Sequence, residues 1–383
     1  MTRLLVVGAG HAHLEILRRQ ILTPLPVELT LISPGPLHHY SGMVPGYLQG
    51  TYGEDEIAFH LPELVERAGG RFLQASAVGI DPRRQVVRLE GGEIAYDLVS
   101  FAVGSNTAGV EAPEVAPHAQ RIKPIGKAAE LRRRLRELAL AEGSGGEVSI
   151  VVVGGGAAGV EVALAAAAVL EDGGAPHRIT IVEAGEEILS GYSGRFRRRA
   201  RRLLERRGLA VCTGRRVTAV HAAAAELEEG QLLPARLTIW LTGAVAWPLF
   251  RGSGLPLDER GFLLLDDALR SIGDPRVFAA GDCGTLARHP GTPKAGVYAV
   301  REAPVLWQSL QAAVLAGREP PRYTPQESFL SLLNTGDGRA LLRWKGVVSH
   351  SRWAWRLKDR IDRRFMARYE WLLGRDSNPR PIG

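Results

Sequence analysis

The chain has 383 residues, of which 45% are hydrophobic and 23% charged, so it is long enough for two or three domains with cores of their own. Its net charge of +7 suits an anionic cofactor or an anionic membrane surface, and equally a solvated basic exterior. Two cysteines, Cys212 and Cys283, exclude a disulfide framework, and no apolar run reaches the ~18 residues of a membrane-spanning helix, so we expect a cytoplasmic protein.

The N-terminus predicts a strand followed by a nucleotide-binding loop. Residues 4–7 form an apolar strand, and the loop at residues 8–13 carries glycines at 8 and 10. His13 occupies the position of the third glycine, so the fingerprint is imperfect. The next predicted strand, residues 29–32, ends at Ser33, which can bond a ribose hydroxyl where an acid is usual. His11 and His13 are too few for a metal site, so we predict no metal; polar packing beside the loop is the alternative.

The following hundred residues predict short elements. Residues 38–46 are dense in Gly, Pro and His and predict a loop, either an ordinary surface turn or one that faces a cofactor. Residues 54–106 alternate short strands and turns, and the last strand runs into a turn at Gly104. A basic amphipathic helix is expected at residues 126–141, followed by a Gly- and Ser-rich linker at residues 142–147.

Residues 149–183 carry the clearest motif of the chain. A β-branched strand leads into a loop with glycines at 154, 156 and 159, then an apolar helix, then a strand that ends at Glu183. The glycines permit a tight turn, close approach of backbone to a pyrophosphate, and close packing of helix on strand. Glu183 lies 24 residues after the last glycine, where a carboxylate can accept both ribose hydroxyl protons. The alternative is a βαβ unit that binds no phosphate.

The second half of the chain predicts further strands with polar ends. Residues 195–207 form an arginine-rich helix, most simply a solvated face; without interleaved aromatics, nucleic-acid binding is not expected. Cys212 lies in a predicted buried strand and should be inert. Two strands end in Thr242-Gly243 and Gly281-Asp282, and in the second a carboxylate can bind a polyol hydroxyl. Residues 294–310 predict a loop that enters a helix, and strands near residues 340–342 precede a C-terminal helix at 353–373.

That last helix is amphipathic. Its apolar stripe is surrounded by arginines and lysines, as in helices that lie in a membrane interface, but Asp359, Asp362 and Glu370 dilute the charge. Packing of the same face on the protein is the alternative. The stripe consists of Leu357, Ile361, Phe365, Tyr369 and Leu372, with Trp353 near the start of the helix.

These motifs together resemble the two-dinucleotide-binding-domain flavoproteins of the pyridine nucleotide-disulfide oxidoreductase family, over about residues 3–315. The resemblance implies an α/β fold with two Rossmann-like domains, an FAD domain interrupted by an NAD(P)H domain, plus a small C-terminal α+β region. We expect FAD binding at residues 1–125 and 246–318, NAD(P)H binding at 126–245, and the C-terminal region at 319–383. The cofactor-binding residues implied are Gly8, Gly10, His11, Ala12, His13, Ser33, Ser41, Gly42, Ala102, Gly104, Gly154, Gly156, Gly159, Glu183, Thr242, Gly243, Gly281, Asp282 and Lys294.

Three stretches narrow the resemblance. Residues 40–46, 294–301 and 353–366 are similar to the flavoprotein domain found fused to selenide, water dikinase, a branch similar to type II NADH dehydrogenases, which reduce quinones. Arg301 and Glu302 stand where such quinone reductases tend to have glutamines.

The resemblance implies that hydride passes from NADH to FAD and that electrons then pass to a quinone or similar acceptor. Glu161 would lie near the nicotinamide, although the helix dipole alone also favours an acid there. Lys294, Tyr298, Arg301 and Glu302 would lie on the acceptor side of the flavin, unless Lys294 is simply a surface lysine. NADH is expected over NADPH, because Glu183 would repel a 2′-phosphate.

Two other functions are open. One is a low-turnover flavoprotein partner or redox sensor linked to selenium metabolism. The other is a disulfide or sulfide reductase, which the positions of the cysteines disfavour. The sequence does not name the acceptor. It is compatible with an oligomer, and with a peripheral position on the inner face of the cell membrane.

Overall fold

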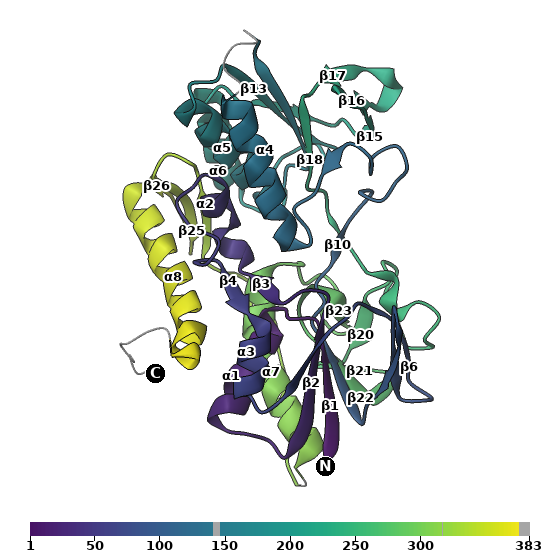
Figure 1. Ribbon diagram of the computed structural model, residues 1–383. Helices are drawn as coiled ribbons and strands as arrows, with labels where there is room; N and C mark the ends of the chain where they lie inside the picture. Colours follow the sequence, from purple (N-terminus) through teal and green to yellow (C-terminus); the bar gives the residue numbers. More distant parts are fainter. Residues whose placement is uncertain (141–145, 316, 375–383) are drawn as a thin grey trace.

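The computed structural model describes residues 1–140, 146–315 and 317–374. Two sheets lie one above the other, and the C-terminal helix runs alongside both (Figure 1). The fold is α/β with two Rossmann-like halves and a small C-terminal α+β region, as predicted. Most of the predicted linker, residues 142–145, lies outside the described residues.

The first sheet has eight strands in the order β23-β20-β21-β22-β9-β1-β2-β5. Its centre is parallel, because Leu4 to Val7 pair with both neighbours in register. Helices α1 (His11–Leu22), α3 (Leu61–Arg67) and α7 (Gly296–Val314) belong to this half. The strands are β1 (Thr2–Val7), β2 (Val27–Ser33), β5 (Arg71–Gln74), β9 (Leu98–Phe101), β20 (Leu263–Leu265), β21 (Arg270–Ser271), β22 (Asp274–Ala279) and β23 (Gly284–Leu286).

The second sheet has five parallel strands in the order β11-β18-β12-β13-β14. They are β11 (Ala119–Gln120), β12 (Val148–Val153), β13 (His177–Glu183), β14 (Ala210–Thr213) and β18 (Leu237–Trp240). Three helices, α4 (Ala128–Leu140), α5 (Ala157–Asp172) and α6 (Gly194–Arg206), accompany it, and a small antiparallel sheet covers part of it: β15 (Val217–Val220), β16 (Ala224–Leu227) and β17 (Leu232–Pro234).

Two short strands connect the halves. β10 (Asn106–Thr107) leaves the first half and pairs antiparallel with β19 (Ala244–Val245), which returns to it. The second domain is therefore an insertion whose two ends lie side by side. Other short elements are η2 (Ile125–Lys127), η3 (Glu228–Gly230), η4 (Pro248–Phe250), η5 (Gly281–Cys283) and an antiparallel sheet of β6 (Ala77–Asp81), β7 (Val86–Leu89) and β8 (Gly92–Ala95).

Two local predictions were wrong. The expected loop at residues 38–46 contains strand β3 (Leu37–His39), paired with β4 (Ala58–His60), and two helical turns, η1 (Ser41–Met43) and α2 (Val44–Leu48). The Gly and Pro content wrongly favoured a loop. Pro45 fits the first turn of α2, because a backbone N–H in that turn has no partner within the helix and its loss costs no hydrogen bond. Cys212 is only partly buried, because β14 is the edge strand of its sheet.

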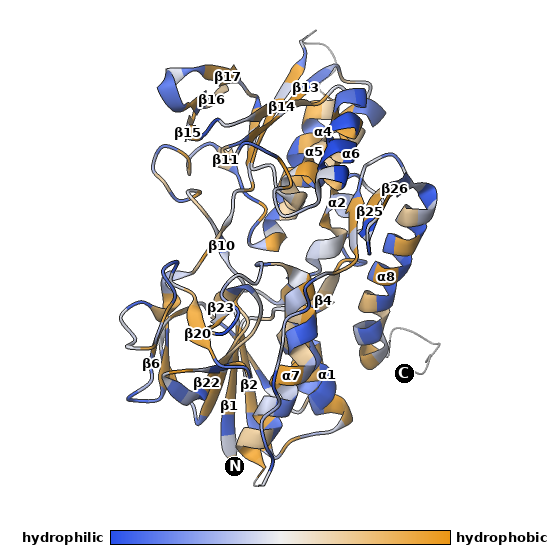
Figure 2. Cartoon of the chain, turned by 180° about the vertical axis from the view of Figure 1, so that it is seen from behind, coloured by the Kyte–Doolittle hydropathy of each residue, from blue (hydrophilic) through white to orange (hydrophobic). Residues whose placement is uncertain are grey.

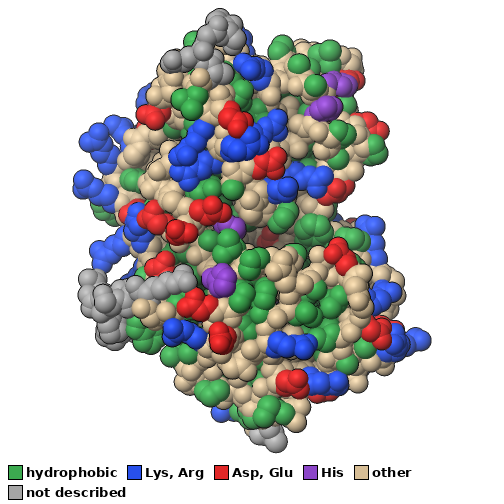
Figure 3. Space-filling view, viewed as in Figure 1, with side chains coloured by type: hydrophobic (Ala, Val, Ile, Leu, Met, Phe, Trp, Pro, Cys, Tyr) green, Lys and Arg blue, Asp and Glu red, His purple; other side chains and the backbone are tan. Residues whose placement is uncertain are grey.

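The core explains why α5 is almost entirely apolar. Its Ala, Val and Leu side chains are buried where the helix contacts α4, α2 and its own sheet. In contrast, α6 is hydrophilic except for Phe196, Ala200, Leu203 and Leu204, which form its buried face (Figure 2). Lys and Arg side chains also gather over α4, and the surface is hollowed between the two halves (Figure 3).

The C-terminal region consists of a hairpin sheet and helix α8 (Arg352–Glu370), followed by η6 (Trp371–Leu373). The sheet is β24 (Ser331–Asn334), β25 (Ala340–Trp344) and β26 (Val347–Ser351). The predicted apolar stripe is divided between the protein and solvent. Tyr369 and Leu372 are buried and Phe365 partly so, whereas Ile361 and Trp353 are exposed. Between them the helix buries charge: Lys358 and Asp362 form an ion pair of 2.8 Å with side chains less than one tenth exposed.

This buried ion pair should contribute more than any exposed residue of α8 to the stability with which the helix packs on the protein. Replacing Asp362 with alanine removes the ion-pair partner of the buried Lys358 ammonium and costs about 3–5 kcal/mol of stability. We expect Asp362→Ala to lower the melting temperature by several degrees in calorimetry. Arg364→Ala, an exposed change on the same helix, should leave it within about one degree. Equal melting temperatures for both variants would contradict this assignment.

Candidate functional site

The first glycine loop joins β1 to α1 and lies against the end of β9. Gly8 has φ of +81°, and a Cβ there would lie 2.7 Å from the Ala102 carbonyl oxygen. Gly10 donates its N–H to the same oxygen at 3.0 Å and also has no room for a side chain. Ala12 is buried in the first turn of α1, and Ser33 ends the neighbouring strand β2. The structure thus brings these residues together at the carboxyl ends of neighbouring strands: Gly8, Gly10, Ala12, Ala102 and Ser33.

His13 replaces the third glycine and closes this loop by hydrogen bonds. Its Nδ1 lies 2.6 Å from the Gly8 carbonyl oxygen, and its Nε2 lies 2.9 Å from the Ser100 hydroxyl. The side chain is fully buried, and this burial lowers its pKa to about 4, so the ring is neutral. Both ring nitrogens are hydrogen-bonded, so His13 fixes the glycine loop against strand β9.

His11 stands at the start of α1, and both it and Ser41 of η1 lie against Gly296. Its ring packs edge-on against His38, Tyr40 and Phe365, with centroids 5.5–5.6 Å apart. Its Nδ1 is buried without a partner among the described residues, and burial lowers its pKa to about 4. A buried nitrogen without a partner is unusual in native proteins, so this position has capacity for a ligand.

Asp282 follows β22, at the same end of the sheet as the first glycine loop. Gly281 has φ of +74°, and its N–H donates to the Glu302 carboxylate at 2.5 Å. The Asp282 carboxylate accepts from the Ser105 hydroxyl at 2.8 Å, and the Lys123 ammonium lies 3.6 Å from it. Sequence reasoning missed Ser105 and Lys123. The Gly-Ser turn after β9 was recognised, but nothing in the sequence places Lys123 beside a residue so far along the chain.

Of the four residues expected on the acceptor side, three line one small cavity and the fourth, Arg301, is exposed. Glu302 is buried beneath Gly281, which raises its pKa to about 7, while Arg301 is exposed. The Lys294 ammonium donates to the Gly284 carbonyl and to Thr285, and lies over the Phe262 ring. It is therefore not the surface lysine of the alternative interpretation. Tyr298 is buried near Gln326. Lys294, Tyr298 and Glu302 surround one small cavity with Asp282, and Arg301 does not line it.

The second glycine loop joins β12 to α5. A Cβ on Gly159 would lie 1.8 Å from the Gly154 carbonyl oxygen, so helix and strand pack too closely for any other residue. Gly156 has open space in front of it, where a pyrophosphate would approach. Glu183, at the end of β13, accepts from the N–H groups of Gly155 and Gly185, both at 2.7 Å. These contacts hold its carboxylate beside the loop.

Gly104 and the Thr242-Gly243 pair lie where the chain crosses between the halves. The Thr242 hydroxyl donates to the Ala108 carbonyl oxygen at 2.5 Å, and the Gly243 carbonyl accepts from the Ala108 N–H at 2.9 Å. Gly104 has φ of +66° and turns the chain at the end of β9. These residues therefore join the two cofactor loops.

Glu161 lies one helical turn into α5, at the contact with the C-terminal region. Its carboxylate accepts from the Asn334 N–H at 2.7 Å, and burial raises its pKa to about 7, against the opposing charge of Lys358. Lys358 donates to the Gly42 carbonyl at 2.7 Å, and Asp362 accepts from the Tyr40 hydroxyl at 3.2 Å. The sequence showed Lys358 and Asp362 as part of a charged helix; their i,i+4 spacing was the available signal.

Both loops have the shape that dinucleotides require. Each has a glycine backbone at the carboxyl end of parallel strands, a helix N-terminus, and a carboxylate nearby. The absence of a Cβ at Gly156 leaves room for phosphate. Among the described residues no cluster of His, Cys, Asp and Glu could hold a metal ion. The arrangement can therefore bring two dinucleotides to the junction between its halves.

Comparisons with known proteins agree with this geometry. The family model "Pyridine nucleotide-disulphide oxidoreductase" matches residues 2–312. The demethylphylloquinone reductase of Synechocystis sp. is 30% identical over 76% of this chain and 73% of its own. An external alternative NAD(P)H-ubiquinone oxidoreductase of Solanum tuberosum is 25% identical, and the chain spans 56% of its length. The fold is that of the NDH2 of Plasmodium falciparum solved with NADH: TM-score 0.83, 16% identity, 97% of this chain and 96% of that one.

The buried His13 ring should make stability depend on pH. Its pKa is lowered from 6.5 to about 4 in the folded chain, so the unfolded chain takes up the proton first as pH falls. The free energy of unfolding should therefore decrease between pH 6.5 and pH 4, by up to about 3 kcal/mol from this group. In His13→Gln this contribution should vanish in denaturant titrations at constant FAD. The exposed change His60→Gln should keep the wild-type profile, and identical profiles for all three proteins would refute the assignment.

Proposed function

The chain belongs to the pyridine nucleotide-disulphide oxidoreductase family, and on that premise we propose that it is an FAD-dependent NADH dehydrogenase that reduces a quinone or similar acceptor. The observation that carries the proposal is the pair of glycine loops, each at the carboxyl end of a strand in the parallel part of its sheet. When bound, the flavin and nicotinamide supply the redox chemistry themselves. The protein has to bind them, orient them and exclude water.

The acceptor is inferred from the relatives. Their names give demethylphylloquinone and ubiquinone as substrates, and NADH or NADPH as donors. A disulfide reductase is not supported, since Cys283 is buried, its thiol donates to the Phe101 and Ala280 carbonyls, and burial raises its pKa to about 11. Cys212 lies in the other sheet.

We assign roles to the chain's own residues from their contacts. Gly8, Gly10, Gly281 and Asp282 would hold FAD, with His13 and Glu302 positioning the two loops. Glu183 would bind the nicotinamide nucleotide's ribose. Glu161, whose pKa is raised to about 7 by burial, would lie near the nicotinamide and could hold or release a proton near neutral pH. Lys294 supports the Gly284 backbone, so its role is to fix the loop that follows Asp282.

An anaerobic titration tests this function. The purified protein should be yellow with noncovalent FAD, and NADH should bleach it rapidly. A quinone should restore the colour faster than water-soluble disulfides. The double variant Cys212→Ser, Cys283→Ser should still be bleached and reoxidised, because no thiol takes part. A protein that takes up no FAD would contradict the proposal. Slow bleaching by NADH, with no acceptor that reoxidises the flavin, would favour the redox-sensor alternative.

Glu183 should set the preference for NADH. Its carboxylate would repel a 2′-phosphate, so Glu183→Gln should raise the ratio of kcat/KM for NADPH to that for NADH by at least about tenfold, or ~1.4 kcal/mol. Glu186→Gln removes the same charge from an exposed position three residues along the chain. It should leave the ratio within about twofold. Equal effects of the two variants would mean that Glu183 does not contact the ribose.

We also propose that the outer side of α8 rests on an anionic membrane surface. None of the described helices is long and apolar enough to cross a bilayer. However, Trp353, Ile361, Trp344 and Val347 are 63%, 41%, 41% and 57% exposed. They lie on α8 and the adjoining hairpin, which share one side of the molecule (Figure 1). The exposed arginines at positions 356, 360 and 364 flank them, each worth about 1 kcal/mol near anionic lipid.

Vesicle sedimentation measures this contact. The protein should bind vesicles that contain phosphatidylserine at low salt and leave them as salt rises. The triple variant Trp344→Ser, Trp353→Ser, Ile361→Ser should lose binding and slow only the reduction of lipid-soluble quinones. Point changes are preferable to truncation of α8, because truncation would expose the core beneath the helix.

The control is a triple variant at other exposed apolar positions. Val78, Ile272 and Leu232 are 51%, 51% and 56% exposed and lie away from α8. Their change to serine should leave vesicle binding intact. Binding lost equally in both triple variants, or absent from the wild type at low salt, would exclude the membrane contact.

A further inference from the structure

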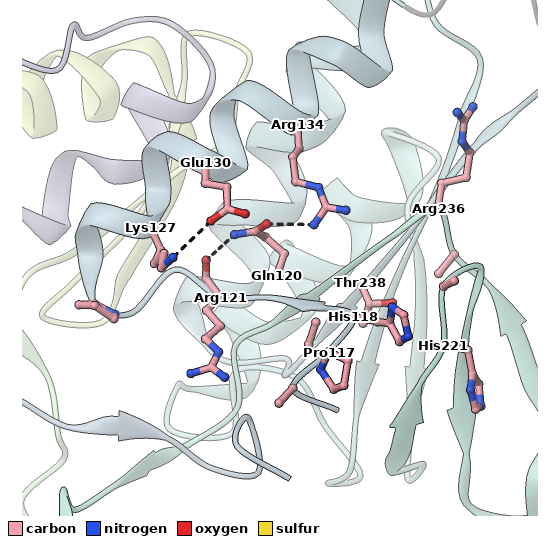
Figure 4. A pocket seen from close by; sticks show the side chains of 15 residues that line it. Pro117, His118, Gln120, Arg121, Lys127, Glu130, Arg134, His221, Arg236 and Thr238 are labelled. Atoms are coloured by element: carbon pink, nitrogen blue, oxygen red, sulfur yellow. Dashed lines mark hydrogen bonds and ion pairs between the residues drawn. The ribbon is translucent and has the colours of Figure 1, made fainter. Parts of the chain in front are cut away.

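A cavity of about 490 Å³ opens at the free edge of the second sheet, beside β11. Three parts of the chain form its walls: residues 116–121, the start of α4 with the residues just before it, and the segments at 221–222 and 235–238. Figure 4 shows the lining side chains, with Gln120, Glu130 and Arg134 lying toward one another. None of the lining residues belongs to either glycine loop, and Glu183 is not among them. The cavity is therefore separate from the two cofactor sites.

The cavity has an excess of positive charge. Arg121, Lys127, Arg134 and Arg236 line it, and Glu130 is the single carboxylate among the lining residues. Lys127 lies 3.5 Å from Glu130, and Arg121 pairs with Glu111 outside the cavity. Arg134 bonds only the neutral Gln120, and the Arg236 guanidinium has no acceptor among the described residues. Two of the arginines that line the cavity therefore have no counter-charge among the described residues.

One of the cationic groups, that of Arg134, is held in place by a buried polar side chain. Gln120 is only 4% exposed; its amide oxygen accepts from Arg134 at 3.1 Å, and its amide nitrogen donates to the Arg121 carbonyl at 3.0 Å. Thr238 is 3% exposed and lines the cavity, yet its hydroxyl has no partner among the described residues. Buried hydroxyls are normally paired, so this one is available to a ligand. The pocket thus combines a fixed arginine with an unused buried donor.

We propose that this cavity binds a small phosphorylated anion, and that binding there is coupled to the flavin site through residues 121–123. Guanidinium groups match phosphate oxygens in geometry and charge. A volume of about 490 Å³ lies within the range of small-molecule sites. The side chains that line it are polar or small, and none is Phe, Tyr or Trp, which favours a charged ligand over an apolar one.

The coupling follows from the short segment that both sites share. Arg121 is among the residues that line the cavity, and two residues later Lys123 donates to the Ser105 hydroxyl at 2.9 Å and lies 3.6 Å from Asp282. An anion that draws Arg121 away from Glu111 pulls on this segment. Lys123 would then shift relative to Asp282, which the proposed function places at FAD. By linkage, FAD must change the affinity for the anion by the same factor.

Calorimetric titration of the FAD-loaded protein with inorganic diphosphate tests the site. Saturating NAD⁺ keeps the second glycine loop filled. The wild type should bind one diphosphate. The double variant Arg134→Ala, Arg236→Ala should weaken binding at least tenfold, whereas Arg133→Ala, Arg136→Ala, which removes two charges from exposed positions on the same helix, should weaken it less than twofold. Equal losses in the two variants would reduce the effect to general charge, and no binding by the wild type would overturn the site.

Two further measurements sharpen the assignment. Thr238→Val keeps the shape and charge of the pocket, so a threefold or larger loss of diphosphate affinity identifies the hydroxyl as a ligand; an unchanged affinity removes it from the site. ATP in place of diphosphate distinguishes the sources of the phosphoryl group. Tighter binding of ATP identifies a nucleotide ligand, and equal or weaker binding identifies an inorganic one.

The coupling has its own readout. The dissociation constant of FAD should change at least threefold when diphosphate saturates the wild type, and should not change in the Arg134→Ala, Arg236→Ala variant. No change in the wild type would overturn the coupling. Failure to bind FAD at all would count against the proposed function, while diphosphate binding by the same protein would still establish the cavity as an anion site.

Discussion

One buried ammonium group holds three parts of this molecule together. Lys358 reaches from α8 to the Gly42 carbonyl of the first domain, pairs with Asp362 on its own helix, and acts through its charge on Glu161 of the second. Asp362 in turn accepts from Tyr40, and Asp359 from Tyr52. Buried charge is expensive unless it is paired and hydrogen-bonded, so this arrangement fixes one position of α8. The aromatic cluster around His11 and Phe365 then packs beneath the helix.

The backbone architecture was predictable because it depends on local rules. A β-branched strand followed by glycines and an apolar helix has few other ways to fold, and β12, α5 and β13 formed as expected. The turns at residues 38–46 were not predictable, because one of the contacts that stabilise them, from the Lys358 ammonium to the Gly42 carbonyl, comes from far along the chain. Burial of Cys212 was misjudged for a related reason. An apolar strand has the same sequence pattern at the edge of a sheet as at its centre.

The candidate site divides in the same way. The glycines at 8, 10, 154 and 159 could be assigned from spacing, since each is required by a close backbone contact. The partners of the polar residues could not. Glu302 belongs beneath Gly281, and Lys294 against Gly284, only because α7 packs on the end of β22. Lys123 follows β11, and it reaches Asp282 across most of the second domain in sequence. Spacing within a motif does not encode such contacts.

The inserted second domain affects how the chain folds while it is being synthesised on the ribosome. β9 pairs with β22 in the finished sheet, yet β22 emerges only after the whole insertion has been made. Until then the apolar edge formed by residues 98–101 has no neighbour on one side and could pair with another chain. The insertion also returns to its starting point, with Thr107 opposite Ala244. It can therefore complete its own sheet early and deliver β22 close to the waiting edge, which shortens the time during which a nascent chain is open to aggregation.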